Sequence, residues 1–89
     1  RRREGRFLQM ISTVAARDCG RAGIVIGSKA LSRAVDRNRV RRMLRVRLAN
    51  ARPAIEGYDV VLGLRKATPR AEFHLIADEA AELLSALTA

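Results

Sequence analysis

The sequence predicts a small α+β protein, in which helices form one layer against a small central sheet in the order β-β-α-β-α. Its 89 residues allow one domain with a single modest core, so residues 1–89 are expected to form one unit. Short runs rich in β-branched residues alternate with two segments whose apolar residues recur with a helical period. These observations favour a two-layer sandwich, with a further short strand or turn in residues 1–5.

The first two strands are expected at residues 6–14 and 22–27. The first run, RFLQMISTV, mixes apolar residues with Ser and Thr, and the second, AGIVIG, is β-branched and bounded by glycines. The second pattern is typical of a well-buried strand. Residues 15–21, with Asp18 and Gly20, resemble a hairpin loop. The two strands are therefore predicted to pair with each other, antiparallel.

A first helix is predicted over residues 36–51. Its apolar stripe faces the core and comprises Val40, Met43, Leu44, Leu48 and Ala51. Pro53 stops this helix, and Gly57 opens a turn.

A third strand and a second helix complete the chain. Residues 58–64, YDVVLGL, are so apolar that they predict a central strand. Thr68 and Pro69 are expected as the N-cap and the first residue of the helix. Its apolar stripe is unbroken and contains Phe73, Ile76, Ala77, Ala80, Leu83, Leu84 and Leu87.

The charge of the chain indicates a polyanionic partner. Eighteen Lys and Arg residues stand against 9 Asp and Glu, for a net charge of +9. Residues 29–52 hold nine basic residues and one acid, whereas residues 71–89 hold four acids and no Lys or Arg. This concentration favours a docking face for phosphates. Sixteen of the basic residues are arginines, which suit bidentate phosphate contacts, although a high-GC genome enriches arginine as well.

The first predicted helix carries arginines on the surface away from its apolar stripe. Arg37, Arg41 and Arg45 follow one another at four-residue steps, with Arg39 and Arg42 beside them. Like charges at this spacing repel and weaken an isolated helix. A bound anion would neutralise them, so the band is predicted to be the docking face.

Other classes of function have little support in the sequence. No apolar run approaches the roughly 18 residues of a membrane span, and no signal-peptide pattern is present. The single cysteine, Cys19, forms no internal disulfide and has no metal-ligand spacing, which favours a reducing, cytoplasmic location. His74 lies off the apolar stripe without a nucleophile, and Asp78, Glu79 and Glu82 more often make a soluble face than a cation site. Neither a catalytic nor a metal site is expected in the protein.

The sequence RAGIVIGSKALSRAVDRNRVRRMLR at residues 21–45 resembles the signature region of the bacterial ribonuclease P protein family. Ser28-Lys29, Ala34-Val35 and the run RNRVRR at residues 37–42 stand at the spacing of the family. Residues 59–61 and Arg65-Lys66 resemble the strand and basic segment that follow. The resemblance covers most of the chain from Arg6 onward.

This resemblance implies a fold, a set of partners, and separate roles for the RNA and the protein. The arginine-rich helix would belong to a β-α-β unit with a left-handed crossover and would bind the catalytic RNA of ribonuclease P. A cleft between sheet and helix would hold the 5′ leader of precursor tRNA. The RNA, with Mg²⁺ held mainly by RNA and substrate, would cleave off the leader. The protein would be a non-catalytic subunit, one copy per RNA, with no membrane contact.

Site residues follow from this resemblance. The expected RNA-binding residues are Ser28, Lys29, Arg33, Arg37, Asn38, Arg39, Arg41, Arg42 and Arg45. The expected leader-binding residues are Phe7, Met10, Arg65 and Lys66. Asn38 is equally suited to a local hydrogen bond in the first helical turn. Ser28-Lys29 and Arg65-Lys66 also fit ordinary polar strand ends.

The chain departs from the family pattern in three places. The aromatic-bearing N-terminal helix of the family is missing before Arg1, so the chain is expected to be truncated or divergent. Met10 stands where family members often have an aromatic residue, and Ala30 replaces a second lysine. Leader stacking is therefore less supported than RNA docking.

Three other functions have less support in the sequence. A structural RNA-binding protein of ribosomal type would share the basic helix. A free-standing nuclease lacks the clustered carboxylates or paired histidines that it needs. A helix-turn-helix DNA reader lacks a second helix across a tight turn before the basic one.

Overall fold

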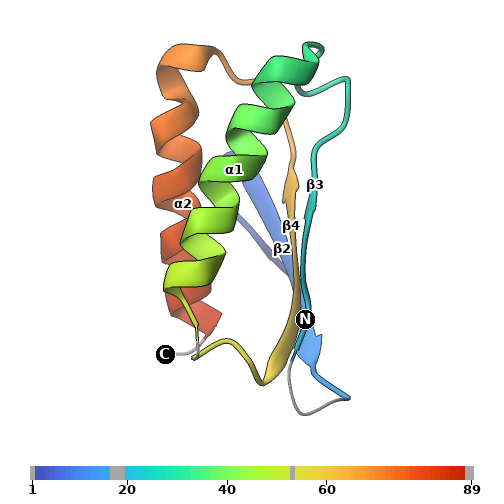
Figure 1. Ribbon diagram of the computed structural model, residues 1–89, viewed down its shortest axis with the longest axis vertical. Helices are drawn as coiled ribbons and strands as arrows, with labels where there is room; N and C mark the ends of the chain where they lie inside the picture. Colours follow the sequence, from blue (N-terminus) through green and yellow to red (C-terminus); the bar gives the residue numbers. More distant parts are fainter. Residues whose placement is uncertain (1, 17–19, 53, 88–89) are drawn as a thin grey trace.

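The computed structural model describes residues 2–16, 20–52 and 54–87. Its elements follow the chain as strands and helices of an α+β fold (Figure 1). In order they are β1 (Arg2–Glu4), β2 (Leu8–Val14), β3 (Ala22–Val25), α1 (Ala34–Asn50), β4 (Tyr58–Leu64), the 3₁₀ turn η1 (Arg70–Glu72) and α2 (Phe73–Leu87).

The sheet has the strand order β1-β2-β4-β3. β1 and β2 are antiparallel, β2 and β4 are antiparallel, and β3 runs parallel to β4. The parallel pair is joined through α1, which gives the β-α-β unit that the family resemblance implies. The central position predicted for β4 is confirmed, and residues 2–4 form the short strand expected near the start of the chain.

The predicted pairing of the first two long strands is wrong. β4 lies between β2 and β3, so these two strands share no ladder. The parallel β3–β4 pair requires a long crossover, which α1 supplies, and an alternation pattern does not specify which partner a strand selects. Asp18 and Cys19 of the expected hairpin loop lie outside the described residues.

Both helices cover the same face of the sheet, side by side (Figure 1). The register places Leu8 opposite Leu64, Met10 opposite Leu62, and Ser12 opposite Val60, all on the covered face. Met10 is 2% exposed and Leu62 is 0% exposed. The alternate positions face away from the helices, where Ile11 is 41% exposed.

Residues 22–27 are less buried than the sequence predicted. β3 is an edge strand, and Val25 is 60% exposed because no helix covers its face of the sheet. Only alternate positions reach the core: Ile24 packs partly against it and Ile26 is 8% exposed. A glycine-bounded apolar run therefore marks an edge strand here.

The apolar stripes of both helices are confirmed. In α1, Val40, Leu44 and Leu48 are buried and Met43 packs beside them. The buried residues of α2 are Phe73, Ile76, Ala77, Ala80, Leu83 and Leu84, and Leu87 packs beside them. The helix ends at Asn50, before Pro53, which lies outside the described residues.

The predicted N-cap at Thr68 is wrong. The chain enters α2 through η1, which begins at Arg70 and has no side-chain cap. Thr68 is 6% exposed, and its hydroxyl instead donates to the carbonyl of Lys66 at 3.1 Å. The hydroxyl thus satisfies a loop carbonyl two residues earlier, a local bond that Thr makes readily in turns.

Candidate nucleic-acid interface

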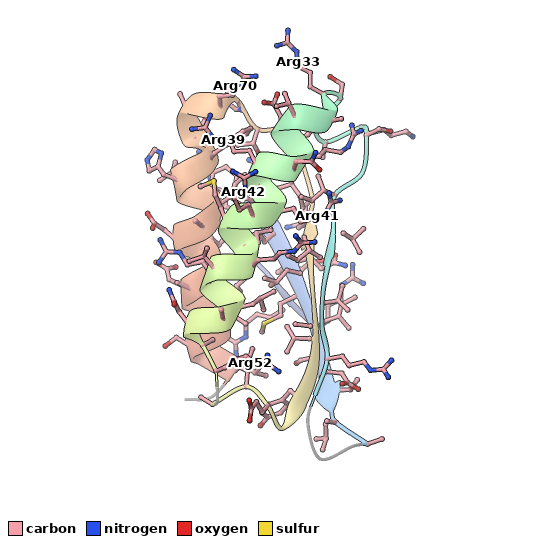
Figure 2. All side chains as sticks on the ribbon, viewed as in Figure 1. Arg33, Arg39, Arg41, Arg42, Arg52 and Arg70 are labelled. Carbon is pink, nitrogen blue, oxygen red and sulfur yellow. The ribbon has the colours of Figure 1, made fainter. Side chains whose placement is uncertain are left out.

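The two polar and basic segments that follow β3 and β4 lie at the same end of the sheet. Because β3 and β4 are parallel, both strands leave the sheet at that end. Ser28 and Lys29 follow β3, Arg65 and Lys66 follow β4, and all four are exposed. α1 also begins there, and Arg33 and Arg70 project from this end (Figure 2). Positive charge therefore gathers where the loops leave the sheet.

The arginines of α1 divide into two groups, and the predicted single band opposite the core is wrong. Arg41 follows Val40 by one residue, or about 100° around the helix, so it flanks the core face. Arg41 and Arg45 line a groove next to β3. Arg42 projects from the outer surface of α1, and Arg39 leans toward the side of α2 (Figure 2).

Several arginines of this region are held by partners within the protein. Arg37 donates from Nη1 to the carbonyls of Leu31 at 2.8 Å and Ser32 at 2.9 Å, which ties the preceding loop to α1. Arg47 lies 3.5 Å from Asp78 on α2. Arg37 is therefore half-buried in a structural role and presents less of its guanidinium to an RNA than the sequence suggested.

Four other arginines of this region have no partner of this kind. No hydrogen bond or ion pair to another described residue occupies the side chains of Arg33, Arg39, Arg42 and Arg45, and all four are exposed. We call these four residues the arginine surface. Unpaired guanidinium groups in water are ready to make bidentate contacts with phosphates.

Asn38 makes a local side-chain hydrogen bond within α1, which is one of the two roles that the sequence suggested for it. Its Oδ1 accepts a hydrogen bond from Nη1 of Arg41 at 3.2 Å. Asn38 lies about one turn into α1 and Arg41 about two turns in, and Asn38 is exposed. This bond orients the Arg41 guanidinium, and the amide nitrogen of Asn38 has no partner among the described residues, so contact with RNA stays a prediction.

Three of the four predicted leader-binding residues meet near the start of β2. The ring of Phe7 has the Cζ atom of Arg6 at 5.1 Å and the Nζ atom of Lys66 at 5.3 Å from its centroid. The backbone N–H of Arg65 donates to the carbonyl of Phe7 at 2.8 Å. We call Arg6, Phe7, Arg65 and Lys66 the Phe7 cluster. Contacts between cations and an aromatic face contribute about 0.5–1 kcal/mol at exposed sites.

Phe7 and Met10 are not placed for direct stacking on an RNA base. Phe7 is 4% exposed and Met10 is 2% exposed. Met10 faces the helices from the middle of β2, because it pairs with Leu62 on the covered face. Within the cluster, only the cationic side chains reach the surface.

A groove lies between α1 and β3, and of its lining residues the sequence pointed only to Arg41 and Arg45 as binding residues. It measures about 640 Å³ and brings Arg21, Arg52 and Tyr58 together with Arg41 and Arg45. It depends on β3 being an edge strand, which the sequence pattern did not indicate.

Neither a metal centre nor a membrane span is found in the part of the chain that the structure describes. No group of three or more His, Cys, Asp and Glu residues there is placed to hold a metal ion. No helix there is long and apolar enough to cross a bilayer. The expectation that Mg²⁺ is held by RNA and substrate stays a prediction.

Fold and site together define a small basic α+β protein with an arginine-rich helix inside a β-α-β unit. The chain belongs to the ribonuclease P protein family, whose model matches residues 1–88.

Comparisons with individual proteins agree with this family. The chain is 34% identical over 62 residues to the ribonuclease P protein component of Pseudomonas paraeruginosa (strain DSM 24068 / PA7), across 70% of this chain and 46% of that protein. The match thus spans about half the length of that relative. The fold resembles the RNase P protein from Thermotoga maritima, with a TM-score of 0.76, 20% identity and coverage of 97% of this chain and 82% of the other. A second structure of that protein, in complex with 1-(4-fluorophenyl)-2-thiourea, gives a TM-score of 0.73 at 20% identity, with 99% and 83% covered.

Proposed function

We propose that this chain is the protein subunit of a ribonuclease P. It binds the catalytic RNA and the 5′ leader of precursor tRNA, and so assists the removal of that leader to form the mature 5′ end. Family membership supports the assignment to an endoribonuclease complex. The observation that carries the RNA contact is the arginine surface, because four exposed guanidinium groups, three on α1 and one at its N-cap residue Arg33, stand without partners among the described residues.

The protein contributes electrostatics and positioning in this proposal. The catalytic RNA and precursor tRNA are both polyanions and repel each other, and a chain of net charge +9 between them screens that repulsion. Mg²⁺ bound by RNA and substrate supplies the Lewis acid for phosphodiester hydrolysis. No side chain of the protein takes part in the bond-breaking step, and one copy of the chain serves one RNA.

The leader is proposed to run past the Phe7 cluster. Arg65 donates to the carbonyl of Gly5 at 2.8 Å and lies 3.7 Å from Glu4, so its guanidinium has a fixed position near the β1–β2 turn. Lys66 is exposed and rests over Phe7. The buried ring of Phe7 does not contact the leader itself but holds the cationic side chains of Arg6 and Lys66 in place. Met10 packs in the core and stabilises the sheet.

The experiment is cleavage of a precursor tRNA by a bacterial ribonuclease P RNA at low Mg²⁺, with and without the chain, beside protein alone. We expect stimulation only when RNA and protein are both present. The variant Arg39→Ala should lose much of the stimulation. The matched control Arg47→Ala removes the same charge from the same helix but at an arginine paired with Asp78, and should retain it.

The results separate the proposal from its alternatives. Cleavage by protein alone would identify a free-standing nuclease. Tight binding to structured RNA with no stimulation would favour a structural RNA-binding protein of ribosomal type. Equal stimulation by both variants would remove the arginine surface from the mechanism.

A further inference from the structure

The groove between α1 and β3 combines an apolar interior with a basic rim. Tyr58 lines it half-buried, next to the core residues Leu48 and Ile55. Four arginines surround this interior: Arg21 at the start of β3, Arg41 and Arg45 on α1, and Arg52 beyond the end of α1. A volume of about 640 Å³ is in the range of pockets that bind small molecules and cofactors.

The rim of the groove keeps positive charge that no carboxylate among the described residues neutralises. Glu56 is the one carboxylate among the lining residues, and it lies 3.7 Å from Arg52. Arg45 has no partner among the described residues, and the side chain of Arg21 likewise has none there. Arg41 donates one bond, to Asn38, and keeps its other donors. The groove is therefore suited to an anionic group at its mouth.

The free edge of β3 adds backbone donors and acceptors to the groove. The carbonyl of Arg21 accepts from the N–H of Val60 at 2.8 Å, so alternate residues of β3 from Arg21 onward bond to β4. The peptide groups of Ala22 and Ile24 consequently point to the other edge, where no strand of the described sheet lies. Both residues line the groove.

We propose that this groove binds a single unpaired nucleotide of an RNA. The base would enter against Tyr58 and the apolar interior, the free peptide groups of β3 would meet its polar edge, and the arginines would hold its phosphate. Sequence-tolerant recognition of single-stranded RNA uses this combination of aromatic stacking and guanidinium groups. A base inside a duplex is stacked and paired, so an unpaired position is required. The inference rests on the proposed RNA-binding function, but it concerns a different surface from the Phe7 cluster.

The test compares two variants of equal charge on the same helix. Ala49→Glu places a carboxylate at the groove, which Ala49 lines, whereas Val46→Glu places it on the outer surface, where Val46 is 53% exposed and lies outside the groove. Each is titrated with a decamer of riboadenosine and with the same decamer carrying abasic riboses. For the unaltered chain we expect the intact decamer to bind about 10-fold tighter than the abasic one. Val46→Glu should keep this ratio, and Ala49→Glu should reduce it toward one.

Tyr58 supplies an independent signal. The chain has one tyrosine and no tryptophan, so its intrinsic fluorescence reports on the groove. We expect quenching by the intact decamer and by adenosine monophosphate, but not by inorganic phosphate. Equal quenching by phosphate, or the same binding ratio in both variants, would overturn the nucleotide groove while leaving RNA binding in place. If the unaltered chain binds neither decamer nor catalytic RNA, the proposed function itself fails.

Discussion

The carboxylate of Glu79 on α2 lies against Gly5, in the space that a Cβ atom at residue 5 would occupy. From there it accepts hydrogen bonds from the backbone N–H of Phe7, at 3.1 and 3.0 Å, and of Leu8, at 3.0 Å. One side chain of a helix thus holds the turn between β1 and β2. The Phe7 cluster begins in this turn, so its position depends on the contact between Glu79 and Gly5.

Gly5→Ala is expected to destabilise the protein by about 1–3 kcal/mol, because the added methyl group displaces a carboxylate that serves two backbone donors. Urea unfolding measures the change. In an Glu79→Ala background the same substitution should cost much less, since the two residues are in direct contact and their effects are not additive.

Glu79→Gln is expected to cost about 1–2 kcal/mol, because one carboxylate oxygen becomes an NH₂ group that cannot accept a backbone hydrogen bond. Glu82→Gln, on an exposed position of the same helix, is the control and should stay within about 0.5 kcal/mol. Equal unfolding midpoints for the two variants would show that Glu79 does not hold the turn.

Met10→Tyr tests the face on which β2 presents its side chains. Because Met10 is 2% exposed and packs in the core, the larger ring should destabilise the protein by about 1–3 kcal/mol and give no gain in leader affinity. Ile11→Tyr, at the neighbouring position that is 41% exposed, should change stability by less than about 0.5 kcal/mol. Thermal unfolding and leader binding are measured for both. Improved leader binding by a stable Met10→Tyr variant would contradict the buried position.

Patterns local in the sequence predicted the helices correctly, because the burial of a helix face depends on residues three or four positions apart. Val40, Leu44 and Leu48 define the core side of α1 in the sequence and in the structure. Pairing of strands is not local: β4 is inserted between β2 and β3 although it follows both in the chain. The groove beside β3 follows from that insertion, so it was not predictable from the pattern.

The candidate site was predicted only in part, again because local patterns in the sequence do not specify contacts between distant residues. The arginines of α1 are adjacent in sequence, and their concentration is visible in composition alone. Which of them are engaged depends on distant residues: Arg47 meets Asp78 of α2, and Arg70 meets Asp36 from beyond β4. Local sequence therefore identified the basic helix but not the subset of its charges that is unpaired.

Arg42→Ala is expected to weaken binding to the catalytic RNA and to lower the slope of log K against log salt by about 0.9 for one lost phosphate contact. Arg47→Ala removes the same charge, but from a side chain that is paired at 3.5 Å with Asp78, and should change the slope much less. Filter-binding titrations over a range of salt concentrations measure both slopes. Identical slopes in the two variants and the unaltered chain would show that Arg42 contacts no phosphate.

Asp36→Asn is expected to lower stability and to strengthen RNA binding. Asp36 lies in the first turn of α1, is bonded to Nε of Arg70 at 2.8 Å, and is the one acid within residues 29–52. Losing the ion pair and the favourable position at the helix N-terminus should cost about 1 kcal/mol. The variant gains one unit of positive charge at the basic end of the molecule and frees Arg70, which raises RNA affinity. Arg70→Ala breaks the same pair and removes a positive charge, so it should destabilise similarly but weaken binding. If both variants shift RNA affinity in the same direction, charge at this end does not govern docking.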